Sequence, residues 1–179
     1  GLAREVLDGL PDFFEANVDA HDAEHSIEVQ MPLVHEFFKG LPVLPIMVPP
    51  DAPAVEAGAR IARLPSAKDV VAVASSDLTH YGEAYGLAPA GFGSKAHAWM
   101  RQNDERMLDL IRRLEAERNC EEADKSRNAC GPGAIAAAVA FARERGAKEG
   151  VVLERTDSHE VQGGGEPFHM AVGYAGIVM

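Results

Sequence analysis

The sequence is poor in cysteine and in long apolar runs, and each shortage excludes a class of protein. It has 179 residues and two cysteines, Cys120 and Cys130, too few for the disulfide framework of a small secreted protein. No apolar run approaches the ~20 residues of a membrane-spanning helix, and no signal peptide is recognisable at the start. We therefore expect a protein of the reducing cytoplasm that has no membrane partner.

Basic charge is also scarce. The chain has 17 Lys and Arg against 28 Asp and Glu, a net charge of −11 at pH 7. Nucleic-acid binding needs a basic face and anionic membranes attract basic segments, so the acidic balance argues against both. The sequence has no P-loop, Gly-x-Gly-x-x-Gly, His-Glu-x-x-His or Gly-x-Ser-x-Gly motif, so nucleotide binding and standard serine hydrolysis have no support.

Composition and periodicity predict one α/β domain over residues 1–179. With 46% hydrophobic and 25% charged residues, the chain is an ordinary globular protein. Because helical patterns alternate with apolar runs, we expect a largely parallel or mixed central sheet with helices on both faces. Helices are predicted at 2–10, 27–38, 55–64, 95–118 and 132–146, and strands at 41–48, 69–74, 151–155 and 170–179. Pro32 either kinks the second helix or lies in the first turn of a helix starting near it.

Val70–Gly82 is the stretch that most strongly indicates a functional site. An apolar run typical of a buried strand is followed at once by Ser76, Asp77 and His80. In open α/β sheets, ligands bind beyond the carboxyl ends of the strands. Imidazole can transfer a proton near neutral pH or bind a metal, which makes His80 the best general-base candidate. Asp77 either orients His80 or caps a turn.

Other polar residues lie at the boundaries of predicted elements. Glu24 and His25 open a predicted helix; solvated capping would explain a carboxylate there, and His25 is as readily a buried histidine bonded to a carbonyl as a ligand. Cys130 precedes a helix N-terminus, which favours the reactive thiolate, although a buried inert cysteine is the usual alternative. His159 follows a predicted strand, at the sheet edge expected for His80. No role is expected for the remaining histidines, His21, His35, His97 and His169.

Four motifs in the chain resemble the Memo family, known in bacteria and archaea as AmmeMemoRadiSam system protein B. They are Glu-His-Ser-Ile-Glu-Val-Gln-Met-Pro at 24–32, Ser-Ser-Asp-Leu-Thr-His-Tyr-Gly at 75–82, Asn-Ala-Cys-Gly at 128–131 and Val-Gly-Tyr-Ala-Gly at 172–176. The resemblance implies the LigB-like fold of the class III extradiol dioxygenases, which use non-haem iron(II). It covers the C-terminal two-thirds of the family, because the family's Pro-His-Ala-Gly-Tyr and Gly-Pro-Ser-His motifs do not occur here.

The resemblance also implies roles for individual residues. His80 corresponds to the acid/base histidine, supported by Asp77, and it joins Cys130 as a metal ligand. Cys130 stands where the dioxygenases have a metal-binding glutamate. The implied metal is iron or copper, or else zinc, and none is expected if the two absent histidine motifs are essential. The pocket is expected to include Glu24, His25, Ser76 and His159.

Three functional hypotheses follow. The first is a metal-dependent redox enzyme related to the extradiol dioxygenases. The second is a non-catalytic module that binds a small molecule or peptide, or a radical-SAM or AMMECR-type protein. The third is a cysteine nucleophile at Cys130 with His80 as its base. We expect His80 and Cys130 to share one pocket with His25 nearby; convergence of the two side chains would favour the first or third hypothesis, and side chains that point apart would favour the second. An exposed sheet edge would favour a homo-oligomer.

Overall fold

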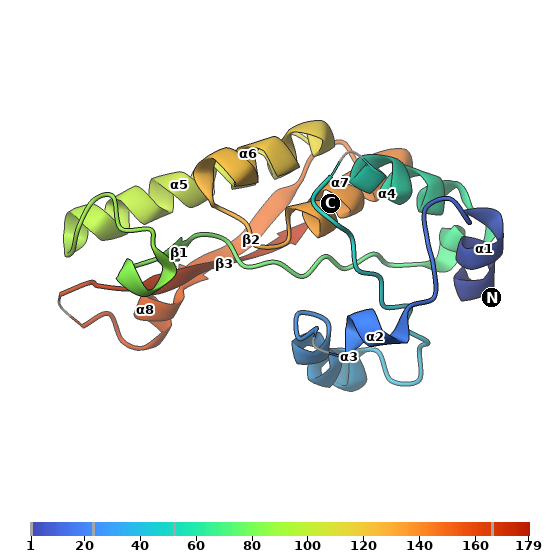
Figure 1. Cartoon of the computed structure of the whole chain (residues 1–179), viewed down its shortest axis with the longest axis horizontal. Coiled ribbons are helices and arrows are strands. Elements are labelled where there is room, and N and C mark those ends of the chain that lie inside the picture. Colours follow the sequence, from blue (N-terminus) through green and yellow to red (C-terminus); the bar gives the residue numbers. More distant parts are fainter. Residues whose placement is uncertain (1, 23, 52, 166) are drawn as a thin grey trace.

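The computed structural model describes residues 2–22, 24–51, 53–165 and 167–179 (Figure 1). Gly1, Ala23, Ala52 and Glu166 lie outside the described residues. The helices and strands are α1 (Leu2–Gly9), α2 (Val18–His21), α3 (Met31–Phe37), α4 (Pro53–Arg63), β1 (His80–Tyr81), α5 (Ser94–Arg112), α6 (Asn119–Ser126), α7 (Pro132–Glu144), β2 (Val151–Asp157), α8 (Ser158–Val161) and β3 (Ala171–Val178).

The sheet of this mixed α/β structure has three antiparallel strands in the order β1-β3-β2. His80 pairs with Val172 on one side of β3, and Asp157 pairs with Gly173 on the other. The predicted α/β character is confirmed, but among the described residues the sheet is antiparallel rather than largely parallel or mixed. The reason lies between β2 and β3, where α8 and a turn with positive φ at Gly163 and Gly164 reverse the chain instead of forming a long crossover.

Two predicted strands are wrong. The predicted strands at 41–48 and 69–74, the second together with the residues that continue it to 79, form no regular strand within the part of the chain that is described. Prolines interrupt the first segment and cannot donate to a ladder. The second segment is not the buried strand we expected, since Val71 and Val73 are 75% and 68% exposed. It reaches the sheet at its end, where Leu78 N–H donates to the Gly173 carbonyl at 2.9 Å.

The helices follow the predictions more closely. Helices α1, α4 and α7 lie where periodicity placed them, and Pro32 occupies the first turn of α3, which confirms that alternative. Helix α5 ends at Arg112 rather than near residue 118, because Leu114 adopts a positive φ of 54°. No helix was predicted between residues 118 and 132, but α6 (Asn119–Ser126) lies there.

The main core lies between α4, α5, α6, α7 and the sheet, where Met107, Leu108 and Val139 are completely buried. Helices α4 and α7 approach closely at Gly58, where a Cβ would lie 2.0 Å from the Ala137 carbonyl oxygen. A second cluster around Tyr81, Met100 and Phe168 fills the space near β1.

A buried carboxylate on α5 anchors the start of β1. Asp104 accepts a hydrogen bond from Thr79 N–H at 2.9 Å, and its other oxygen lies 3.4 Å from Arg155 Nη2 on β2. Its side chain is 3% exposed. Asp104 therefore connects the helix to both outer parts of the sheet.

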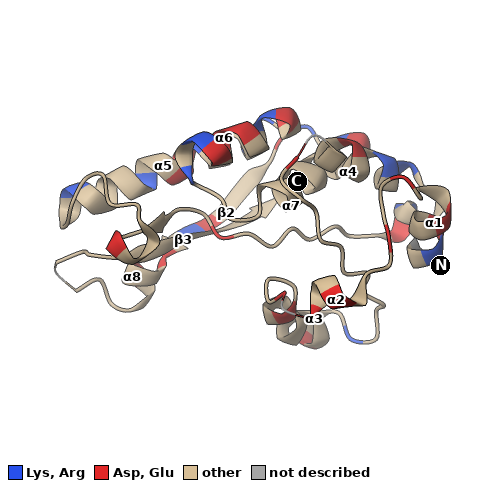
Figure 2. Ribbon diagram, in the orientation of Figure 1, with Lys and Arg blue, Asp and Glu red and all other residues tan. Residues whose placement is uncertain are grey.

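Charges of both signs alternate along α5 and α6 (Figure 2). Many form surface pairs, such as Arg106 with Glu122 at 3.1 Å, and exposed pairs of this kind stabilise a fold only slightly. These two helices therefore present no continuous basic surface. Among the described helices, none combines the length and apolar character needed to cross a membrane.

Candidate metal and acid–base site

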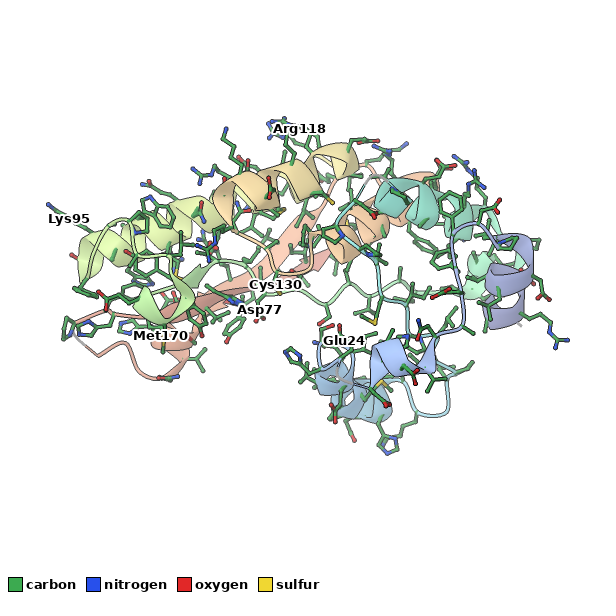
Figure 3. All side chains as sticks on the ribbon, in the orientation of Figure 1. Glu24, Asp77, Lys95, Arg118, Cys130 and Met170 are labelled. Carbon is green, nitrogen blue, oxygen red and sulfur yellow. The ribbon has the colours of Figure 1, made fainter. Side chains whose placement is uncertain are left out.

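The side chains of Asp77, His80 and Cys130 converge where the segment before β1 passes the N-terminal end of α7. Their ligand atoms all lie within 4.8 Å of one another. His80 Nε2 is 3.2 Å from Asp77 Oδ2, and Asp77 N–H donates to Cys130 Sγ at 3.2 Å. In Figure 3, Asp77 and Cys130 lie close together beneath α6. The structure thus brings His80 and Cys130 together as expected, while their chemical roles stay predictions.

Backbone contacts hold Cys130 in this position. Its N–H donates to the Asp77 carbonyl at 3.1 Å, and the next N–H, of Gly131, donates to Ser76 Oγ at 2.9 Å. Only glycine fits at 131 without a shift, because a Cβ would lie 2.9 Å from the Ser75 carbonyl oxygen. Cys130 therefore lies beside the N-terminus of α7, with its sulfur facing the Asp77 N–H.

Gly131→Ala is expected to slow alkylation of Cys130 by about fivefold. The added methyl group pushes the Cys130 loop away from Ser75, so the thiolate loses the Asp77 N–H donor, and a hydrogen bond of ~1 kcal/mol corresponds to about that factor. The rate is measured with a chromogenic thiol reagent in a Cys120→Ser background. Gly176→Ala is the control, because no heavy atom lies within 4 Å of a Cβ there. Equal rates in both variants would show that Gly131 does not position the thiol.

A cavity of about 430 Å³ opens beside the three side chains. This size is within the range of small-molecule pockets. Arg127 at its rim donates to the carbonyl oxygens of Tyr85 and Gly86, both at 2.8 Å, and the Tyr85 ring packs 5.0 Å from the His80 ring. The wall is mixed in character and consists of Leu78, His80, Leu87, Ala123, Asp124, Arg127, Ala129 and Cys130.

The predicted pocket residues Glu24 and His25 do not line this cavity. Glu24 accepts the Ser26 N–H at 2.5 Å, and hydrogen bonds from Ser26 hold the pKa of Glu24 below its ordinary value. Local capping therefore accounts for Glu24, and its label in Figure 3 lies apart from those of Asp77 and Cys130. The segment that contains Glu24 and His25 contacts the site only indirectly, because Ser75 Oγ donates to the Ser26 carbonyl at 2.8 Å. Ser76 contributes through its hydroxyl, 3.8 Å from Cys130 Sγ.

His159 was expected at the same sheet edge as His80. His80 pairs with Val172 and Asp157, at the end of β2, pairs with the neighbouring Gly173, so both chain segments lie at the same end of the sheet but on opposite sides of β3. The His159 ring packs near His97 and Phe168, at 5.7 and 5.1 Å between ring centroids, and its predicted place in the pocket stays a prediction. His97, for which no role was expected, lies 2.6 Å from Asp157. Sequence spacing carried no signal for this pair, since 60 residues separate the two.

The fold and the site define a mixed α/β protein with a thiol, an imidazole and a carboxylate beside a cavity. The family model described as Memo-like protein matches residues 3–178, and the chain belongs to this family. It is 35% identical to a MEMO1 family protein of Thermococcus kodakarensis over 99% of the chain and 63% of that relative. A MEMO1 family protein of Pyrococcus furiosus is 31% identical with the same coverage, and one of Methanosarcina acetivorans is 35% identical over 98% of the chain and 62% of its own length. The chain thus spans less than two-thirds of these relatives.

Proposed function

We propose that the chain belongs to a metal-dependent redox protein that shares the fold of the extradiol dioxygenases. In this proposal Cys130, His80 and Asp77 hold the metal. The supporting observation is the convergence of their three ligand atoms within 4.8 Å, beside a cavity. Three protein ligands with a free position are the usual arrangement of a catalytic metal site.

The donor set fits a transition metal. A thiolate selects softer ions, and imidazole suits iron, copper and zinc. The Asp77 N–H that donates to Cys130 Sγ would orient the thiolate, as outer contacts do in known metal sites. A bound iron or copper ion would supply electron transfer and polarise an oxygen atom of the substrate.

The protein groups around the ion would bind and orient the substrate. Leu78, Leu87 and Ala123 line the cavity with apolar surface, which favours a small molecule with an apolar or aromatic body. In the alternative in which His80 does not bind the ion, it would be the group that moves a proton, since Asp77 is within hydrogen-bond distance of its ring. Tyr85 restricts the orientation of that ring by packing against it.

Metal content tests this proposal. In a His97→Gln background, which disables the other cluster of potential ligands, the purified protein is expected to contain up to one equivalent of iron, copper or zinc. Cys130→Ser and His80→Gln are expected to reduce this content tenfold or more. Cys120→Ser is the matched control, because Cys120 lies outside the site. Elemental mass spectrometry measures the content, and oxygen uptake with aromatic diols tests the redox activity. Unchanged content in both site variants would contradict the assignment.

The assay should also be repeated on a chain extended to the length of the relatives. Residues supplied by the extension would raise the affinity for the metal if they complete its ligand set. Cys130→Ser should still reduce the content in the longer chain. Metal that the longer Cys130→Ser chain retains would mean that the ion binds at another site.

A second candidate is a non-catalytic module that binds a peptide, a second copy of the chain, or a radical-SAM or AMMECR-type protein. The supporting observation is the apolar surface around α3, where Leu33, Phe37 and Leu41 are exposed, since exposed apolar patches commonly mark interaction sites. The free thiols of Cys120 and Cys130 agree with the cytoplasmic location that we propose. Size-exclusion chromatography with light scattering separates the self-association case from the others.

A further inference from the structure

We propose that His97, Asp157 and Glu160 form a second metal site, which binds a divalent ion such as zinc and is separate from the Cys130 site. The three residues come from the first turns of α5, the end of β2 and α8. Their ligand atoms lie within 4.8 Å of one another. Zinc accepts this combination of imidazole nitrogen and carboxylate oxygens.

Asp157 provides the buried carboxylate of the cluster. Its side chain is 3% exposed, and Oδ1 accepts the Glu160 N–H at 2.9 Å as the N-cap of α8. This leaves Oδ2 facing His97 Nε2 at 2.6 Å.

His97 is held in place by aromatic contacts. Its ring stacks on Phe168 with 4.8 Å between centroids and an angle of 22°, and the His159 ring lies edge-on at 5.7 Å. A ring fixed in this way loses little conformational freedom when it binds an ion. This arrangement resembles the supporting contacts that orient ligands in metal sites.

Glu160 completes the cluster on its solvent side. Its Oε1 is 3.9 Å from His97 Nε2 and 2.6 Å from Arg101 Nη1, and Oε2 accepts from Thr156 Oγ1 at 3.2 Å. In a tetrahedral zinc site with bonds of about 2.1 Å, neighbouring ligand atoms are about 3.4 Å apart. The observed 2.6 and 3.9 Å lie on either side of this value.

The local charge also favours a cation. Asp157 and Glu160 together carry two negative charges, and Arg101 offsets one of them. One negative charge of the carboxylates then remains to attract a divalent ion. The partial exposure of Glu160 gives the ion a route from solvent, since 37% of its side chain is accessible.

The test is titration of the metal-free protein with zinc and with cobalt in a Cys130→Ser background, which removes the thiol of the other site. One equivalent is expected to bind. Adding His97→Gln or Glu160→Gln is expected to weaken the affinity tenfold or more, whereas His35→Gln, at an exposed position of α3, is expected to leave it unchanged. Circular dichroism verifies that each variant is folded. Because the Glu160 side chain is partly exposed, Glu160→Gln is expected to leave the core unchanged.

Cobalt distinguishes this site from the one at Cys130. Cobalt bound by His97, Asp157 and Glu160 should give d–d absorption without a thiolate-to-cobalt charge-transfer band. That band should appear only when Cys130 is present and cobalt occupies the Cys130 site. If the Cys130 site does not bind cobalt, the charge-transfer band alone would be absent. The second site is overturned if the Cys130→Ser protein binds no ion. It is also overturned if adding His97→Gln and adding Glu160→Gln both leave the affinity for the ion equal to that of the Cys130→Ser protein. His97 and Asp157 would then form a hydrogen-bonded pair without a metal.

Discussion

Replacing Asp104 by alanine is expected to lower the free energy of unfolding by about 3–5 kcal/mol, the usual cost of removing one partner of a buried ion pair. The carboxylate accepts from Thr79 N–H and pairs with Arg155, and both groups would lose this partner inside the protein. The effect should be visible as a lower midpoint in urea denaturation followed by circular dichroism.

Asp109→Ala is the matched control on the same helix. Asp109 is more than half exposed and pairs with Arg112 at the surface, so its removal should cost about 0.5 kcal/mol or less. Similar losses in the two variants would show that Asp104 has no special anchoring role.

The stability conferred by Asp104 should also depend on pH. Burial raises the pKa of its carboxyl group, although Thr79 and Arg155 act to lower it. A carboxyl group whose folded pKa is raised contributes most below its unfolded pKa, and the contribution falls as the pH rises through the folded value. The difference between wild type and Asp104→Ala should therefore be widest in acid and narrow toward neutral pH.

Gly58→Ala is expected to destabilise the protein by about 2 kcal/mol, although alanine normally stabilises a helix interior by about 1 kcal/mol over glycine. A Cβ at this position would lie 2.0 Å from the Ala137 carbonyl oxygen. Because the obstacle is the backbone of α7, it cannot rotate away as a side chain would, and α4 and α7 must separate. Overpacking of this kind costs about 1–3 kcal/mol or more, so the steric term exceeds the propensity gain.

Gly176→Ala supplies the control for Gly58→Ala. A Cβ at 176 meets no heavy atom within 4 Å, and the loss of unfolded-state freedom should leave stability equal or slightly higher. Thermal unfolding of the two variants measures the contrast. A Gly58→Ala protein as stable as wild type would mean that α4 and α7 are not in this close contact.

The parts of the fold that could be predicted from the sequence are those set by local rules. Helices α1, α4 and α7 follow from periodicity and from prolines and glycines at their ends. The sheet could not be predicted in the same way, because an apolar run such as Val70–Ala74 does not show whether neighbours cover it. Here that run is largely exposed, and the antiparallel direction of β2 relative to β3 depends on the turn at 163–164.

The candidate site could be predicted only in part, because local patterns reveal single residues but not how the chain packs them together. His80 and Cys130 stood out through their motifs, and the fold brings them together. Glu24, by contrast, is explained by a local turn, which short sequence patterns cannot distinguish from a site. His97 lacked any neighbouring polar motif, and its proximity to Asp157 depends on how α5 packs against β2. The spacing of residues in the sequence does not reveal long-range packing of this kind.

The central position of β3 has a consequence for how the protein matures on the ribosome. The strand that carries His80 is made early, but its pairing partner Val172 is made late. During translation Asp77, His80 and Cys130 can all have emerged before β3 exists to fix the register of β1. The nascent chain therefore passes through a stage in which the thiol is synthesised but the imidazole is not yet held beside it.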